Sequence, residues 1–168
     1  IFMLAKGRNQ AVDLGTYKGR SAAVLSLACR QVHSVDCYGD VDGSFADTID
    51  PNRYKTMQDH SFVANESLAK RLGNMTVESG KSVETAKRGT GMPVDVLFVD
   101  DDHSENSVMS NVNEWTKRMK KGGIIIFHDN NEIHPGVQSA ILKLGKDNRF
   151  RFFSPGEHSG SLAVCEVL

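Results

Sequence analysis

The stretch Val12-Asp13-Leu14-Gly15-Thr16-Tyr17-Lys18-Gly19-Arg20-Ser21 decides how this chain begins to fold. An apolar segment runs directly into an acidic residue, two glycines and the start of a helical pattern. Gly15 allows a tight bend and Gly19 allows the close approach of another group, because neither residue carries a Cβ. The stretch therefore predicts a strand that turns into a helix and presents backbone N–H groups to a ligand.

The ligand predicted for this turn is a cation. The spacing differs from Gly-x-Gly-x-x-Gly, which places a pyrophosphate at a helix N-terminus. Asp13 would lie beside the bound group, where a carboxylate attracts positive charge. S-adenosylmethionine carries an ammonium and a sulfonium, so the turn favours this cofactor. The alternative is an ordinary strand-to-helix turn with an acidic residue in it.

The charge and the length of the chain limit the class of partner that it can have. The chain has 168 residues, with 20 Lys and Arg against 21 Asp and Glu, and a net charge of -1. We expect a single domain over 1–168, with no electrostatic preference for nucleic acid or for a membrane. No apolar run approaches the ~20 residues that span a bilayer. Whether the protein forms a homo-oligomer stays open.

The ends and the cysteines of the chain add two expectations. The first residue is Ile1, almost directly before the first predicted strand, so we expect an N-terminal cap that is missing or reduced to 1–10. Cys29, Cys37 and Cys165 are an odd number without metal-ligand spacing. They are interpreted as reduced thiols of a cytoplasmic protein.

Strand-like and helix-like segments alternate along the sequence. Strands are expected at 11–14, 32–36, 75–78, 94–99, 123–127, 150–153 and 162–167, and helices at 20–30, 62–72, 82–87, 106–119 and 137–144. Segment 37–60 is rich in Asp, Gly and Ser and is expected to be mostly loop. This alternation predicts an α/β fold with a doubly wound, mostly parallel, Rossmann-like sheet. The last two strands have no helix between them, which predicts an antiparallel hairpin at one edge.

Polar residues follow the predicted strands, where ligands bind in sheets of this kind. Asp36 ends the second strand at a position where an acid can accept both hydroxyls of a ribose, or else cap a loop. Asp100, Asp129 and Asn130 follow two later strands and are expected to converge. Their hard oxygen donors suit Mg²⁺ or another divalent cation. His128 is a rival ligand for a softer metal, and simple capping roles for these residues are the alternative.

Taken together, these motifs resemble those of class I S-adenosylmethionine-dependent O-methyltransferases. The resemblance is to the metal-dependent catechol O-methyltransferase type and to bacterial small-molecule and sugar O-methyltransferases, and it covers Ala11 to about Asn130. It implies that the glycine turn holds the methionine end, that Asp36 binds ribose and that Gly80-Lys81-Ser82 contacts adenine. The implied cofactor contacts, including those at the turn itself, are Asp13, Gly15, Tyr17, Gly19, Ser21, Asp36, Gly80, Ser82 and Asp100. The implied metal ligands are Asp100, Asp129 and Asn130.

The chain also departs from the catechol type. His103 stands where that type has a lysine, whereas Asp102 and His103 match an Asp and a His of the sugar type. We therefore expect transfer of a methyl group to a hydroxyl of a small molecule, such as a sugar, a catechol or another metabolite, with Asp102 or His103 as the catalytic base. Segment 37–60 is expected to form the acceptor side of the pocket and to be mobile without ligands.

Two other classes of function compete with this hypothesis. A metal-dependent hydrolase or hydroxylase on the same sheet would use Asp100, His128 and Asp129, and would leave Asp13 and Asp36 without a role. A non-catalytic S-adenosylmethionine-binding module would bind the cofactor without transferring its methyl group.

Overall fold

One mixed sheet organises the chain. The computed structural model describes residues 1–38, 51–154 and 160–168, apart from the side chains of 51–55 and 58. The strands are β1 (Gln10–Leu14), β2 (Gln31–Asp36), β3 (Met75–Ser79), β4 (Val94–Val99), β5 (Met119–Phe127), β6 (Phe150–Phe153) and β7 (Ala163–Val167). The helices are α1 (Phe2–Ala5), α2 (Arg20–Ala28), α3 (Pro51–Leu72), α4 (Ser82–Arg88), α5 (Glu105–Trp115) and α6 (Pro135–Leu144), with a 3₁₀ turn η1 at Thr116–Arg118.

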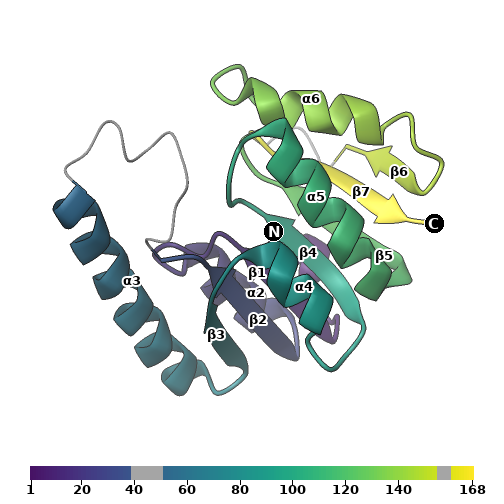
Figure 1. Cartoon of the computed structure of the whole chain (residues 1–168). Coiled ribbons are helices and arrows are strands. Elements are labelled where there is room, and N and C mark those ends of the chain that lie inside the picture. The colour runs from purple at the N-terminus through teal and green to yellow at the C-terminus, as the bar shows by residue number, and fades with distance from the viewer. Residues whose placement is uncertain (39–50, 155–159) are drawn as a thin grey trace.

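The order of the strands is β3-β2-β1-β4-β5-β7-β6. The first five of these are parallel, β7 runs antiparallel to β5, and β6 runs antiparallel to β7. The predicted doubly wound sheet with an antiparallel hairpin at its edge is therefore confirmed. Figure 1 shows β6 and β7 at the side of the sheet opposite β3.

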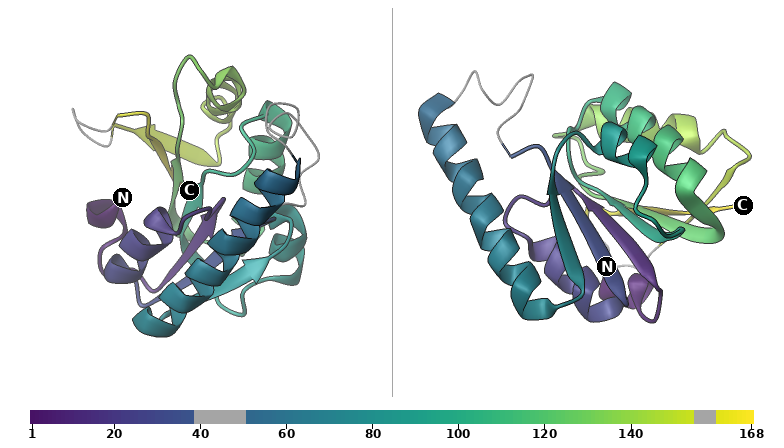
Figure 2. Two further views of the ribbon diagram at one scale, coloured as in Figure 1. Left: turned by 90° about the vertical axis from the view of Figure 1, so that its left-hand side faces the viewer. Right: turned by 60° about the horizontal axis from the view of Figure 1, so that its bottom comes forward.

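Both faces of the central strands are buried, because successive side chains of a strand point to opposite faces. Leu97 and Val99 of β4 belong to the core under α4, α5 and α6. Val96 and Phe98 of the same strand belong to the core under α1 and α2. The continuous apolar run of β4 thus reflects burial on two sides. Figures 1 and 2 show α5 and α6 on one side of the sheet, with α3 standing beside β3 at the opposite edge.

The prediction that 37–60 is mostly loop is wrong for its last part, because α3 begins at Pro51 and not near residue 62. A proline at the first helical position has its φ already suited to a helix, and its missing N–H would have no partner there in any case. Pro51 therefore starts this helix, although it resembles a loop residue in the sequence. Residues 39–50 lie outside the described residues, as does the prediction made for them.

The boundary between α5 and β5 also differs from the prediction. The helix expected at 106–119 ends at Trp115, and η1 leads directly into β5 at Met119. Met119 already pairs with Val94, and the register shifts before Val96 pairs with Ile124. An irregular pairing of this kind has no periodic signature in the sequence.

Among the described helices, none combines the length and the apolar character that crossing a bilayer requires.

Gly15 brings two central strands into close contact at their carboxyl ends. Its φ is +80°, and a Cβ at this position would overlap the carbonyl group of Asp100 and lie 2.7 Å from Cα of Asp101. The turn after β1 and the turn after β4 are therefore packed backbone against backbone. This contact holds the first glycine motif against the acidic run that follows β4.

We expect Gly15→Ala to destabilise the fold by about 3 kcal/mol or more, because the left-handed conformation and the overlap with Asp100 are both penalised. Gly73→Ala is the matched control, since Gly73 has a φ of +75° but no heavy atom within 4 Å of the position that a Cβ would take. The control should lose only about 1–2 kcal/mol. Urea unfolding measures both values, and equal losses would contradict the packing role of Gly15.

Candidate active site

Backbone hydrogen bonds align the carboxyl ends of the parallel strands. Beyond the paired strand residues, the N–H of Gly80 donates to the carbonyl of Asp36, that of Asp100 to Leu14, and that of His128 to Val99, at 2.9–3.0 Å. The ladder therefore continues one residue past the strands. It places the acidic residues at the ends of β1, β2, β4 and β5 along one edge of the sheet, as the sequence predicts.

Asp13 is a fully buried carboxylate near the end of β1. Among the residues that the structure describes, neither of its side-chain oxygens has a hydrogen-bond partner with acceptable geometry. Burial raises the pKa of Asp13 from 3.8 to about 7, and the hydroxyls of Ser21 and Thr16 oppose this shift. Asp100 and Asp36 raise the same pKa through charge repulsion. A buried acid without a partner is costly unless a ligand compensates it, so Asp13 fits a cationic group.

Asp36 anchors the two turns that flank it. Its carboxylate accepts the backbone N–H of Tyr17 at 2.7 Å and that of Tyr38 at 3.0 Å. Both tyrosines have a positive φ, of 42° and 43°, which is uncommon for a large side chain. The carboxylate thus holds two strained turns in place, and its remaining lone pairs are available to a ligand.

Asn65 on α3 is a structural residue of this site that sequence reasoning missed. It is buried, and its Nδ2 donates to the carbonyl of Tyr17 at 2.7 Å and to the hydroxyl of Tyr38 at 2.8 Å. A Cβ at Gly19, which has a φ of +72°, would overlap Oδ1 of the same residue. Gly19 therefore makes room for Asn65. An asparagine in a polar helix gives no sequence signal for this contact.

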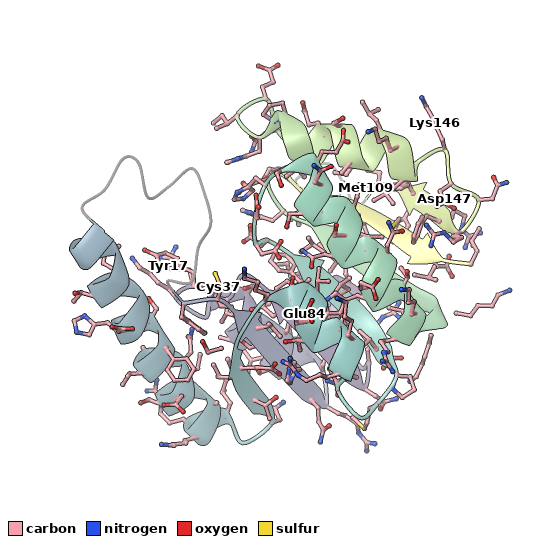
Figure 3. The ribbon with its side chains drawn as sticks, in the orientation of Figure 1. Tyr17, Cys37, Glu84, Met109, Lys146 and Asp147 are labelled. Carbon is pink, nitrogen blue, oxygen red and sulfur yellow. The ribbon has the colours of Figure 1, made fainter. Side chains whose placement is uncertain are left out.

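An open cleft separates the glycine turn from α3. It has a volume of about 310 Å³ and is lined by Tyr17, Lys18, Met57, His60, Ser61 and Ala64. Tyr17 is 39% exposed, so its side chain can contact a ligand in this cleft. Figure 3 shows Tyr17 between α3 and the sheet.

The three consecutive acids after β4 have three different environments. Asp100 lies 3.1 Å from Nδ1 of His128, within hydrogen-bond distance. Asp101 points inward, where Asn111 donates to it at 2.6 Å and Ser82 at 3.0 Å, and burial raises its pKa to about 6. Asp102 is exposed and accepts the N–H of Ser104 at 2.8 Å. The hydroxyl of Ser82 is thus engaged with Asp101.

Asp129 is the centre of a cluster of three histidines. Its φ is +53°, and its carboxylate lies 3.0 Å from Nε2 of His103, 3.2 Å from Nδ1 of His128 and 3.7 Å from Nε2 of His134. Two groups of three side chains in the described residues have the spacing of metal ligands: Asp100, His128 and Asp129, and His103, Asp129 and His134. The predicted ligands Asp100 and Asp129 are brought together, with the rival ligand His128 beside them.

His134 is the second residue that sequence reasoning missed. It lies just before Pro135 at the start of α6, five positions after Asp129, and its ring stacks on that of His103 with centroids 4.1 Å apart. The only sequence signal is a histidine close behind the His128-Asp129-Asn130 motif. Asn130 itself donates its N–H to the carbonyl of Ser161 at 2.8 Å.

His103 and Asp102 differ as candidate bases. The neighbouring carboxylates of Asp100 and Asp129 raise the pKa of His103 above its usual value, although burial opposes the shift. Its Nε2 is directed at Asp129. Asp102 uses one oxygen for the N–H of Ser104 and is otherwise open to solvent. Nε2 of His103 is thus engaged with a carboxylate, whereas Asp102 is exposed.

Solved structures with the same fold come from methyltransferases with different acceptors. An O-methyltransferase from Bacillus cereus, solved in complex with S-adenosylhomocysteine, is 15% identical over 99% of this chain and 76% of that one, with a TM-score of 0.67. An rRNA methylase from Streptococcus thermophilus is 14% identical over 99% and 90% of the two chains, with a TM-score of 0.65. At these identities the likeness establishes the fold, which is that of the class I methyltransferases.

The family follows from the sequence match. A family model described as a methyltransferase domain matches residues 12–130, from the glycine turn to the end of the His128-Asp129-Asn130 motif. The chain therefore belongs to this methyltransferase-domain family. An uncharacterized protein, R132, of Acanthamoeba polyphaga mimivirus is 34% identical over 64 residues, which span 37% of this chain and 29% of that protein.

The environment of Asp13 leads to a prediction about stability and pH. Because its pKa is raised in the folded state, the folded protein holds a proton that the unfolded chain has released between pH 3.8 and about 7. Over that range the free energy of unfolding falls as pH rises, because it is unfavourable to bury the charged form of Asp13. We expect Asp13→Asn to match the parent protein near pH 4 and to be more stable by on the order of 1–3 kcal/mol at pH 8.

Asp95→Asn is the control, because we expect it to lower stability at neutral pH where Asp13→Asn raises it. Hydrogen bonds from Lys120 and from the N–H groups of Gln10 and Asn9 hold the pKa of Asp95 below its usual value despite burial. This acid therefore stabilises the fold at neutral pH, and its contribution is lost as pH falls through the lowered pKa. Urea unfolding at both pH values measures the two variants. A loss of stability on Asp13→Asn at pH 8 would mean that the carboxylate has a partner in the folded chain.

Proposed function

We propose that this protein transfers a methyl group from S-adenosylmethionine to a hydroxyl of a small molecule, with help from a divalent cation. The observation that carries the proposal is Asp13, a fully buried carboxylate without a hydrogen-bond partner in the described part of the chain, at the sheet edge where ligands bind. A cationic ligand would compensate it. Membership of the methyltransferase-domain family and the fold shared with methyltransferases support the same assignment.

The chain offers a contact for each part of this cofactor. Asp13 and the nearby Ser21 hydroxyl would face the ammonium and sulfonium end, and the ring of Tyr17 would lie over it. Asp36 has free lone pairs for the two ribose hydroxyls. The turn at Gly80–Ser82, which follows β3 at the same edge of the sheet, would contact the adenine ring. Bound S-adenosylmethionine supplies a methyl group that is activated by the positive charge on sulfur.

The cation is proposed to lie at Asp100, Asp129 and Asn130, next to the methionine end. Oxygen donors of this kind suit Mg²⁺, which keeps some of its waters and leaves positions for a substrate. A bound divalent cation lowers the pKa of a hydroxyl that approaches it and fixes its orientation. The residues of the chain then hold acceptor and cofactor in line, which supplies much of the acceleration in a two-substrate transfer.

Asp102 is proposed as the residue that accepts the proton of the acceptor hydroxyl. It is exposed next to the acids of the cation site, and only one of its oxygens has a backbone partner. His103, the other candidate, has its Nε2 engaged with the carboxylate of Asp129. We therefore assign His103 to the positioning of Asp129.

A small-molecule acceptor fits the charge of the chain. Positive charge dominates the affinity of proteins for nucleic acid, whereas this chain has a net charge of -1 and acids along its ligand-binding edge. The cleft between the glycine turn and α3 is open to solvent, with a volume of about 310 Å³, and is proposed to admit a small molecule. A hydroxyl of a sugar, a catechol or another metabolite is the acceptor class that we propose.

Calorimetry with S-adenosylhomocysteine tests the cofactor. We expect this product to bind in preference to NAD, and Asp13→Asn or Asp36→Asn to weaken binding by about 1.5–3 kcal/mol, as for loss of a hydrogen bond to a charged group. Asp95→Asn, at the opposite end of β4, is the matched control and should leave the affinity unchanged. Tight binding of NAD without heat from S-adenosylhomocysteine would overturn the assignment.

Turnover with a panel of acceptors tests the reaction. We expect release of S-adenosylhomocysteine with catechols or sugars, dependent on a divalent cation, and none with amines or with ribosomal RNA fragments. Asp129→Ala should abolish turnover and its response to the cation while retaining cofactor affinity. Full activity of Asp129→Ala in a chelator would exclude the cation mechanism, and turnover of RNA alone would exclude the acceptor class.

Asp102→Asn separates the base from the cation site. Loss of a general base lowers turnover by about 100-fold or more, with no effect on cofactor affinity. Glu132→Gln is the matched control, because Glu132 is an exposed acid on the neighbouring turn. If Asp102→Asn and Glu132→Gln had the same turnover, a group other than Asp102 would have to accept the proton of the acceptor hydroxyl.

A further inference from the structure

The histidine side of Asp129 has a different chemistry from the oxygen donors of the proposed cation site. Within the cluster, Oδ1 of Asp129 faces Nδ1 of His128, whereas Oδ2 faces Nε2 of both His103 and His134. His134 plays no part in the proposed methyl transfer. It lies at the start of α6, a helix that follows the metal-binding motif, so its position next to Asp129 needs a separate explanation.

We propose that His103, Asp129 and His134 bind one borderline divalent transition-metal ion, such as Co²⁺, Ni²⁺ or Zn²⁺, through two imidazoles and one carboxylate. The inference goes beyond the proposed function, because it concerns binding of the metal alone and holds whether or not a methyl group is transferred. Imidazole suits these ions, whereas Mg²⁺ prefers oxygen donors and water.

The distances between the donor atoms fit such an ion. With metal–donor bonds of about 2.0–2.1 Å, neighbouring donors of a tetrahedral site lie about 3.3 Å apart. The observed separations from Oδ2 of Asp129 are 3.0 Å to His103 and 3.7 Å to His134, and all three donor atoms lie within 4.8 Å of one another. An ion can therefore be accommodated by small side-chain movements, and solvent access at these half-buried residues leaves room for further ligands.

The fold is also built to bring the two histidines together. Gly136 lies in the first turn of α6, and a Cβ there would overlap the carbonyl of His103 and lie 2.8 Å from the backbone nitrogen of Glu105. The glycine thus allows α6 to start directly against the turn that carries His103. Glu105 then bonds to Ser139 and Lys143 of α6 and holds the helix there.

Ring stacking orients the donors before any ion arrives. The imidazoles of His103 and His134 are stacked with an interplanar angle of 27°, and both direct Nε2 at the same carboxylate oxygen. A site whose ligands are already oriented needs little reorganisation on binding, which raises affinity.

Titration of the full chain with Co²⁺ alone tests the proposal, with visible absorption and calorimetry as readouts. We expect one ion to bind, with the absorption of nitrogen-ligated Co²⁺, and an equal concentration of Mg²⁺ to leave the spectrum unchanged, although both ions would use Asp129. His134→Gln should weaken Co²⁺ binding by more than the roughly 10–100-fold that loss of an outer-shell partner produces. His60→Gln removes an exposed histidine of α3 and should have no effect.

Gly136→Ala is the second variant, because it keeps all three donors and only displaces α6. We expect it to weaken Co²⁺ binding by at least about tenfold, and urea unfolding together with circular dichroism will show that both variants are folded. Equal Co²⁺ affinity in the parent protein and in His134→Gln, displacement by an equal concentration of Mg²⁺, or no binding of Co²⁺ would each overturn the proposal. None of these readouts depends on the cofactor or on turnover, so failure of the methyl-transfer proposal would be seen separately.

Discussion

The contact between Gly15 and the backbone of Asp100 is the constraint on which the site depends. A side chain at Gly15 would overlap the Asp100 carbonyl group, so the turns after β1 and β4 can meet only if the first has no Cβ. This contact joins the half of the edge that carries Asp13 and Asp36 to the half that carries Asp100 and Asp129. Without this contact, the two halves would not form one continuous site.

Several acidic residues lie at one edge of the sheet, and each carboxylate has a different environment. Asp36 accepts two backbone N–H groups, and Oδ2 of Asp101 accepts hydrogen bonds from Asn111 and Ser82. Oδ1 of Asp101 is buried without a partner among the described residues, and for Asp13 this holds for both oxygens. A folded chain normally satisfies its buried polar groups, and exceptions concentrate where a ligand completes the structure. The difference between Asp13 and its neighbours therefore carries more information about function than their shared charge does.

The sequence by itself determined the sheet, because long apolar segments such as β4 and the central part of β5 are recognisable without knowledge of their partners. It also determined which edge of the sheet carries the polar residues, since Asp36, Asp100 and Asp129 end or closely follow predicted strands. The antiparallel hairpin followed from the missing helix between Phe153 and Leu162. These features depend on local periodicity and on general rules of chain connection.

Only the tertiary structure decided the start of α3 and the identity of the residues that complete the site. Pro51 is compatible with a loop and with a first helical turn, and the local sequence does not distinguish them. Asn65 and His134 become part of the site through helices that pack from elsewhere in the chain. The environments of Asp13 and Asp101 were also beyond the sequence, because the pKa of a carboxyl depends on burial and partners that exist only after folding. Short-range pattern specifies the elements, whereas long-range packing specifies which side chains meet.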